Sequence, residues 1–323
     1  MKDVHRFFKG VSPEEVAAQA ARCPGDIVFL KFFLSSPSQA ASVPQIDGAV
    51  SAVVQPPLDG SAVALWAWYV EDAAGVERSA GVTVALDADG FEHIWHAGLT
   101  ASGAGSEEQT AGILTAYEAD LASRGISLAD NCIRTWFYVH DIDNNYAGMV
   151  KARRENFESI GLTPQTHYIA STGICGTPAA GGLVQMDAYA VKGSFSQRYL
   201  YAPTHLNPTY EYGVTFERGV RLETAGTARV LISGTASIDN RGAVLHVGDV
   251  VAQTGRMMEN VEVLLAEAGC SWSGIRQAVF YLRNASDYEK IAPLVAERCY
   301  FPYVVVLAPV CRPDWLIEME CLI

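Results

Sequence analysis

One order of predicted elements occurs twice in the chain, and this repetition constrains the fold more than any other feature of the sequence. In the first half, apolar periodicity predicts strands and helices at residues 62–70, 81–86, 91–96, 106–124, 132–140, 146–160, 167–174 and 182–191. The same order returns in the second half at residues 214–222, 229–233, 249–268, 275–283, 288–298, 303–309 and 315–322. A linker rich in Tyr, Pro and Thr separates the halves at residues 199–212. The pattern indicates an internal duplication.

The two halves also match in individual residues. An offset of 142 places Ile133-Arg134 on Ile275-Arg276, and an offset of 133 places Val184-Gln185-Met186-Asp187 on Ile317-Glu318-Met319-Glu320. The first copy therefore carries glutamine where the second carries Glu318. This difference is expected if the site lies at an interface between one active copy and one degenerate copy. Sequence drift alone would also produce it. We expect an irregular N-terminal cover at 1–60, a degenerate domain at 61–198 and a domain with the site at 199–323.

The closing strand carries two acids on one face. Alternation along a strand points Glu318 and Glu320 to one side, and the apolar residues between and around them to the other. The acids face either solvent, as on an edge strand, or an inter-domain cleft. Trp315 and Leu316 favour a partly closed setting. A carboxyl group among aromatic residues has a raised pKa, which suits a general acid.

Composition excludes several classes of protein. With 36 acidic and 23 basic side chains the formal charge is −13, so general binding to nucleic acid is not expected. An anionic substrate would need a locally built arginine site. No apolar run reaches the roughly 18 to 20 residues of a membrane span, and no N-terminal signal stands out, which favours a cytoplasmic protein.

Metal and cofactor motifs are absent from the sequence. Glycines 173, 176, 181 and 182 lack the spacing of a phosphate-binding loop, and His93 and His96 lack the pattern of zinc ligands. No cofactor and no metal are therefore predicted. The odd number of cysteines and the lack of C-x-x-C favour reduced, mostly buried thiols, at positions 23, 132, 175, 270, 299, 311 and 321.

The second half resembles the RidA/YjgF (endoribonuclease L-PSP-like) family. The similarity lies in the order of elements and in the segments Leu231–Ile238, Gly248-Asp249, Glu259-Asn260 and Leu316–Glu320. This resemblance implies an α+β fold of two tandem chorismate-mutase-like domains, with mixed sheets in a barrel-like core and helices outside. RidA-like domains typically form trimers, so the chain could form a homo-trimer or a monomer with internal pseudo-symmetry.

A narrower resemblance, over roughly residues 60–323, is to the chorismatases. It rests on Trp95-His96, on Arg134–Tyr138, on Ser171–Ile174 and on the spacing from Cys311-Arg312 to Glu318. In that family the first glutamate of the closing strand is the proton donor, and members that make hydroxybenzoate carry a cysteine seven positions before it. The resemblance thus implies Glu318 as general acid and Cys311 as its assistant, and places Arg218 and Gln253 at the carboxylates of the substrate.

The chain also departs from both families. Trp136-Phe137-Tyr138 replaces the usual Trp-Asn-Tyr, no Cys-x-Gly-Arg element follows Phe157, and no lysine occurs in the strand at 277–282. Tyr303 stands after Pro302, where the simple RidA imine hydrolases have an arginine. Loss of a cation that binds an anionic substrate could change the substrate.

Each candidate residue has a structural alternative. Arg312 could lower the pKa of the Cys311 thiol for a nucleophilic or acid–base role, or the thiol could be buried and inert. Arg218 could pair with Glu217 or Glu223 instead of a ligand, and Gln253 could contact a helix N-terminus. The remaining candidates for substrate binding, each of which could instead pack in the core or bond to the backbone, are Tyr138, Tyr212, Thr235 and Glu320.

Three functions remain open from the sequence. The first is a lyase or hydrolase that cleaves the enolpyruvyl ether of chorismate, or of a related anionic cyclic metabolite, and releases pyruvate. The second is a RidA-like imine or enamine hydrolase. The third is a catalytically silent protein that binds a metabolite.

Overall fold

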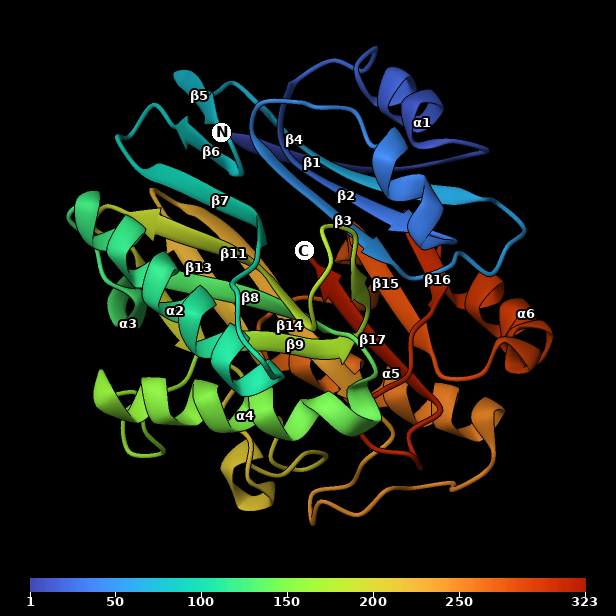
Figure 1. Cartoon of the computed structure of the whole chain (residues 1–323). Coiled ribbons are helices and arrows are strands. Elements are labelled where there is room, and N and C mark those ends of the chain that lie inside the picture. Colours follow the sequence, from blue (N-terminus) through green and yellow to red (C-terminus); the bar gives the residue numbers. More distant parts are fainter.

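Three open β-sheets pack around one core in the computed structural model, which describes all 323 residues (Figure 1). None of the sheets closes on itself into a barrel. Their inner faces meet in a single hydrophobic cluster that includes Trp66, Trp136 and Tyr281, one from each sheet. The predicted α+β class with mixed sheets is confirmed, and the barrel-like core is formed by three separate sheets.

The middle and C-terminal sheets have the same topology. The middle sheet has the order β5-β6-β7-β11-β8-β9, with bounds Gly75–Ser79, Val82–Leu86, Glu92–Leu99, Val184–Lys192, Cys132–Val139 and Ala170–Cys175. The C-terminal sheet has the order β12-β13-β14-β17-β15-β16, with bounds Ser196–Tyr199, Gly219–Thr224, Thr227–Ala236, Ile317–Leu322, Gln277–Leu282 and Tyr303–Leu307. In each sheet only the last pair, β8/β9 or β15/β16, is parallel. The shared topology confirms the duplication.

Helices cover the outer faces of the sheets (Figure 1). Apolar residues of α2 and α4 pack on the middle sheet in a second hydrophobic cluster. Asp249 caps α5 by accepting hydrogen bonds from the backbone N–H groups of Val251 and Ala252. The α-helices α1 to α6 span Pro13–Ala20, Ser106–Ser123, Leu128–Asn131, Ile142–Ser159, Val250–Glu267 and Tyr288–Arg298. The 3₁₀ helices η1 to η4 span Pro37–Ser42, Thr209–Tyr212, Trp272–Gly274 and Ala285–Asp287.

The first sixty residues are not the irregular cover that was predicted. They contain α1 and three strands of a sheet with the order β1-β4-β2-β3-β10, with bounds Lys2–Gly10, Val63–Glu71, Asp26–Leu34, Ala49–Val54 and Thr177–Pro178. β4 is antiparallel to β1 and to β2, and β2 is parallel to β3. This is the arrangement of β17, β14, β15 and β16, so the N-terminal residues form a third unit, which has no counterparts of β5 and β6.

The register of the sheets shows which residues are equivalent. The first residues of the closing strands β4, β11 and β17 pair with the last residues of β2, β8 and β15; the pairs are Val63 with Leu34, Val184 with Val139, and Ile317 with Leu282. The offset of 133 between the closing strands is confirmed. The pairing strands differ by 143 positions, one more than the sequence match suggested.

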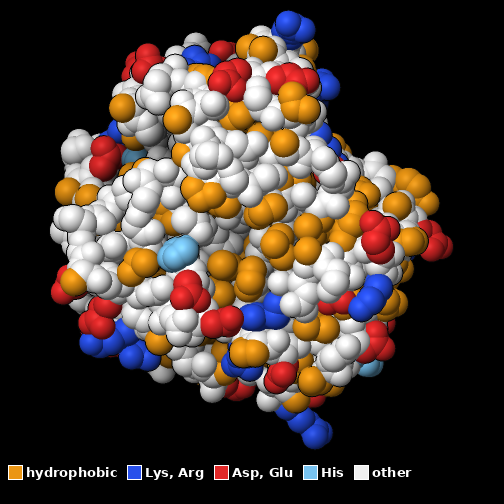
Figure 2. Space-filling model, turned by 45° about the vertical axis from the view of Figure 1, so that its right-hand side comes forward, with side chains coloured by type: hydrophobic (Ala, Val, Ile, Leu, Met, Phe, Trp, Pro, Cys, Tyr) orange, Lys and Arg blue, Asp and Glu red, His pale blue; other side chains and the backbone are white.

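The surface carries interspersed charge. On the face in Figure 2, Lys and Arg side chains lie scattered among Asp and Glu, and hydrophobic side chains gather near the centre. No helix is both long and apolar enough to cross a membrane.

Candidate active site

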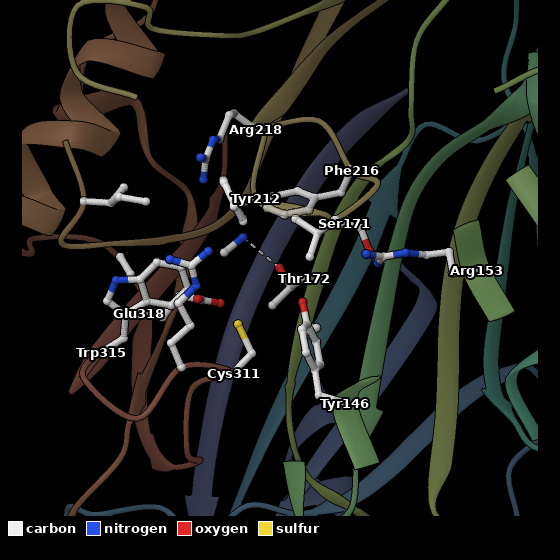
Figure 3. Close-up of a pocket in the computed structure, with 16 residues that line it drawn as sticks. Tyr146, Arg153, Ser171, Thr172, Tyr212, Phe216, Arg218, Cys311, Trp315 and Glu318 are labelled. Atoms are coloured by element: carbon white, nitrogen blue, oxygen red, sulfur yellow. Dashed lines mark hydrogen bonds between the residues drawn. The ribbon is translucent and has the colours of Figure 1, made fainter. Parts of the chain in front are cut away.

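A cavity of about 200 Å³ lies between the middle unit and the C-terminal unit. Helix α4 and strand β9 form one wall, and helix η2, strands β14 and β17 and the neighbouring loops form the other. Figure 3 shows Glu318, Cys311, Thr172 and Tyr146 around the same space. The lining residues are Tyr146, Arg153, Ser171, Thr172, Gly173, Tyr212, Val214, Phe216, Arg218, Gly234, Ala236, Ile238, Cys311, Arg312, Trp315 and Glu318.

Glu318 lines this cavity from the centre of a sheet. β17 lies between β14 and β15, so the alternative of a solvated edge strand is wrong. The side chain is buried, and no protein group forms a hydrogen bond with its carboxyl oxygens. Burial raises the pKa of Glu318 to about 8, with a further increase from the charge of Glu320 and an opposing effect of Arg218 and Arg134. A carboxyl group in this state can hold a proton at neutral pH and donate it to a ligand.

Gly234 provides the space that the Glu318 carboxyl group occupies. A Cβ atom at this position would overlap Glu318 Oε1 and lie 2.7 Å from its Cδ. It would also lie 3.1 Å from Thr172 Cγ2. Glycine on β14 therefore allows the acid to point into the cavity.

Glu320 has a different environment from Glu318, although the two side chains share a face of β17. Four side chains donate hydrogen bonds to its carboxylate, from Arg134, Trp136, Thr172 and Tyr281. It does not line the cavity, so the structure does not bring Glu320 together with the other candidates for substrate binding. Its position in the interface leaves no lone pair free for a ligand.

Three arginines without acidic partners line the cavity. Arg218 and Arg312 both lie over the ring of Tyr212, at 5.4 and 4.6 Å from its centroid. Arg218 donates through Nη2 to Asn207 and leaves Nε without a partner, rather than pairing with Glu217 or Glu223.

Arg153 reaches the cavity from α4, on another side than Arg218 (Figure 3). It is 1% exposed, and it donates to Thr215 Oγ1 at 3.2 Å and to Ser171 Oγ at 3.4 Å. Its Nη2 has no partner. Buried guanidinium groups without counterions indicate a site for an anionic ligand.

Cys311 lines the cavity, and its thiol is protonated. Burial and the neighbouring Glu318 raise its pKa to about 12, while Tyr146 and Arg312 only partly oppose this effect. Arg312 thus lowers the pKa of Cys311 as expected, but burial outweighs its effect. The group can serve as a neutral donor or a packing surface.

Three further predicted binding residues lie outside the cavity. Gln253 donates to the backbone oxygens of His246 and Asp314 and accepts from Leu316 N–H, so it fastens the loop before β17. Thr235 donates to the backbone oxygen of Ser233. Tyr138 is fully buried under the Lys31 ammonium group, in the core. These side chains contact other parts of the chain, and the structure does not bring them together with the residues that line the cavity.

The sequence did not reveal the contribution of α4. Tyr146 and Arg153 both come from this helix, and on a helix a buried arginine has the same periodicity as core residues. Arg153 follows Tyr146 by seven positions, which is two helical turns and one face. This spacing was the sequence signal that could have placed Tyr146 and Arg153 at the same site.

A counterpart of the cavity lies between the N-terminal and middle units, with a volume of about 490 Å³. It is lined by Gln185, Gly98 and Gly81 among others. By register these correspond to Glu318, Gly234 and Arg218. The counterpart thus has neither the acid nor the arginine. The single cavity with both groups is the one at the interface between the middle and C-terminal units.

Comparison with known proteins places the chain in a family. Residues 218–323 match the family model described as endoribonuclease L-PSP. The chain is 36% identical over 96 residues to the 3-aminoacrylate deaminase RutC of Acinetobacter baylyi, across 28% of this chain and 74% of the relative. The chain belongs to this family, which is also known as RidA/YjgF.

Two longer similarities point to one branch of the family. The chain is 27% identical over 290 residues to a 3-hydroxybenzoate synthase of Streptomyces hygroscopicus, across 79% of each protein. Its fold is similar to the crystal structure of a chorismatase, with a TM-score of 0.76 and 21% identity, over 100% of this chain and 98% of that one. The narrower resemblance to chorismatases is thereby confirmed.

Proposed function

We propose that the protein is a chorismatase-like enzyme that cleaves the enolpyruvyl ether of chorismate, or of a closely related dianion, and releases pyruvate. The observation that carries this proposal is Glu318, a buried carboxyl group without a protein partner, in a cavity with three unpaired arginines. An acid that keeps its proton next to cations suits a substrate that is anionic and must be protonated.

The cavity divides these tasks between its walls. Arg218 and Arg312 on the C-terminal side and Arg153 on the middle side bind the two carboxylates of the substrate. Arg153 thus supplies a cation from α4 in a chain that lacks the lysine expected at 277–282. The ring of Tyr212 contacts both Arg218 and Arg312 through cation–π interactions and so helps to position them.

The proposed reaction begins with transfer of the Glu318 proton to the CH₂ carbon of the enolpyruvyl group. The ether carbon then becomes an oxocarbenium ion, which a water molecule attacks, and the bond between the ether oxygen and that carbon breaks to give pyruvate. The ring leaves with its oxygen as a dihydrodiol. Loss of one water from this ring and aromatisation give a hydroxybenzoate, so that chorismate becomes hydroxybenzoate and pyruvate with no net water.

Cys311 favours the aromatic product. It stands seven positions before Glu318, as in the chorismatases that make hydroxybenzoate, and its protonated thiol lines the same cavity. The similarity to a 3-hydroxybenzoate synthase supports the same product. We therefore propose that the Cys311 thiol assists the steps after ether cleavage.

The test is to incubate the protein with chorismate, follow pyruvate, and identify the aromatic product by chromatography. We expect wild-type turnover, loss of at least two orders of magnitude in Glu318→Gln, and a large increase in KM in Arg153→Gln. Arg154→Gln is the control, since Arg154 lies next in α4 but is exposed. Absence of pyruvate with the wild-type protein would contradict the proposal.

A second candidate function is hydrolysis of an imine or enamine. The identity of 36% to a 3-aminoacrylate deaminase favours it. Tyr303 stands where the simple imine hydrolases have an arginine, which argues against it. Release of ammonia from 2-aminoacrylate, with no pyruvate from chorismate, would support this candidate, and binding without any turnover would support a metabolite-binding role.

A further inference from the structure

We propose that Thr172 and Arg134 of the middle sheet are positioning residues, which fix Glu320 as a permanent anion behind Glu318 and thereby keep Glu318 in its acid form. This inference rests on the proposed function, because it explains how the proton donor is prepared. It also assigns a role to the middle unit, which has lost its own acid.

Glu320 is surrounded by donors alone. Arg134 Nη2 lies 2.8 Å from its Oε2, and Thr172 Oγ1 lies 2.5 Å from the same oxygen. Trp136 Nε1 and the Tyr281 hydroxyl group lie 3.0 and 2.9 Å from Oε1. The side chain of Glu320 is 4% exposed and that of Arg134 is 1% exposed. Four donors and a buried guanidinium group select the charged form of this carboxylate.

Thr172 directs its proton to Glu320. Its oxygen accepts hydrogen bonds from Arg134 Nη2 and from the backbone N–H of Gly234, at 2.5 and 2.9 Å. The bond to Gly234 N–H is the dashed line in Figure 3. With both acceptor positions filled, the one hydroxyl proton points to Glu320 Oε2. Thr172 therefore links β9, β14 and β17 at the wall of the cavity.

Arg134 crosses the interface between the two sheets. It extends from β8 of the middle sheet to Glu320 on β17, and it donates through Nη1 to Ser233 Oγ on β14 at 3.1 Å. Loss of this residue would leave the buried Glu320 without a hydrogen-bonded cation and with only the charge of Lys31 nearby, and removing one partner of a buried ion pair is destabilising.

Glu320 is the only carboxylate that faces Glu318. The cations around Glu318 are Arg134, Arg153, Arg218 and Arg312. The neutral polar groups, from α4, η2, β15 and the loop before β17, are Tyr146, Tyr212, Tyr281 and Cys311. The cations favour ionisation of Glu318. Among the charged groups only the fixed charge of Glu320 opposes them, and burial adds to its effect.

The experiment is a titration of the Glu318 carboxyl carbon by ¹³C NMR, in protein with labelled glutamate and without substrate. Glu318→Gln assigns the signal. We expect its midpoint to move to lower pH by one unit or more in Glu320→Gln, and to stay near the wild-type value in Glu320→Asp, which keeps the charge. The high-pH limb of kcat should move in the same direction as the titration. An unchanged midpoint in Glu320→Gln would overturn the proposal.

Thr172→Val tests the same idea if the Glu320 variants do not fold. Without this donor the charged form of Glu320 is less stabilised, so Glu320 takes up a proton more readily at the expense of Glu318. The Glu318 signal at pH 6 should then shift toward the carboxylate position. Thr172→Ser should restore the wild-type signal. Equal signals in all three proteins would contradict the proposal. Because no substrate is present, these results are independent of whether chorismate is turned over.

Discussion

Glu318 and Glu320 differ by two positions and point the same way, yet their environments are opposite. Four donors around Glu320 satisfy a charge, whereas Glu318 has none and faces a cavity. The alternation of a strand predicted their common face, and the aromatic neighbours predicted the raised pKa. The partners of Glu320 come from positions 39 to 186 residues away in sequence, so no local pattern could distinguish the two acids.

The raised pKa of Glu318 predicts how stability depends on pH. The folded-state value of about 8 lies above the unfolded value, so the contribution is complete below pH 4.5 and is lost as pH rises to 8. Glu318→Gln should therefore become more stable than the wild type between pH 5 and pH 8, by on the order of a few kcal/mol. Urea unfolding at both pH values measures this difference, and a difference that does not change with pH would contradict it.

Substitution of Gly234 should reduce enzymatic activity while the protein still folds. In Gly234→Ala the new methyl group displaces the Glu318 carboxyl group, and we expect turnover to fall by at least tenfold. The matched control is Gly255→Ala in α5, where a Cβ atom meets nothing within 4 Å. Pyruvate release and far-UV circular dichroism check both variants, and full activity of Gly234→Ala would contradict the placement of the acid.

The loop before β17 is an element on which the site depends, since it carries Cys311, Arg312 and Trp315. Arg283 at the end of β15 holds it by donating to the backbone oxygens of Val310, Arg312 and Trp315. Gln253 holds its far end. The resemblance implied a binding role for Gln253, whereas in the structure its side chain bonds to the backbone of this loop.

Loosening this loop should weaken binding more than chemistry. In Arg283→Ala, which removes the bonds to three backbone oxygens, we expect KM to rise about tenfold or more with a smaller change in kcat, because Arg312 and Trp315 lose their fixed positions. Arg276→Ala is the control, since Arg276 is exposed and donates to Asp3 far from the cavity. Steady-state kinetics with both variants decide the matter, and an unchanged KM in Arg283→Ala would count against this role.

At the level of elements the second half was predictable, because β13 and β17 alternate between apolar and polar residues and Asp249 caps α5. The N-terminal unit was missed for a physical reason. β2 is a nearly continuous buried run, β3 lies in a segment rich in Ser and Pro, and α1 has only eight residues. Such short elements take their stability from the other two units rather than from their own periodicity.

The whole molecule contains three units in one chain. RidA-like domains typically bury their sheet faces in a trimer, and here the three inner faces already meet in one core. The duplication was predicted from the sequence, but the third unit and its pseudo-threefold arrangement were not. The cavity with both the acid and the arginine lies at one interface, while its counterpart has lost both groups.

This arrangement predicts a monomer in solution. Since the inner faces are buried within the chain, no second copy is needed to cover them. Size-exclusion chromatography with light scattering should give a mass near 34.8 kDa. A mass three times larger would show that the units associate further.

The most direct test of the central claim is to cleave chorismate in D₂O and measure the deuterium in the released pyruvate, trapped at once as lactate. Proton transfer from Glu318, whose acidic proton exchanges with solvent, to the enolpyruvyl CH₂ carbon predicts one deuterium in the methyl group with the wild-type protein and no product with Glu318→Gln. Pyruvate without deuterium, or equal release by the variant, would contradict the account.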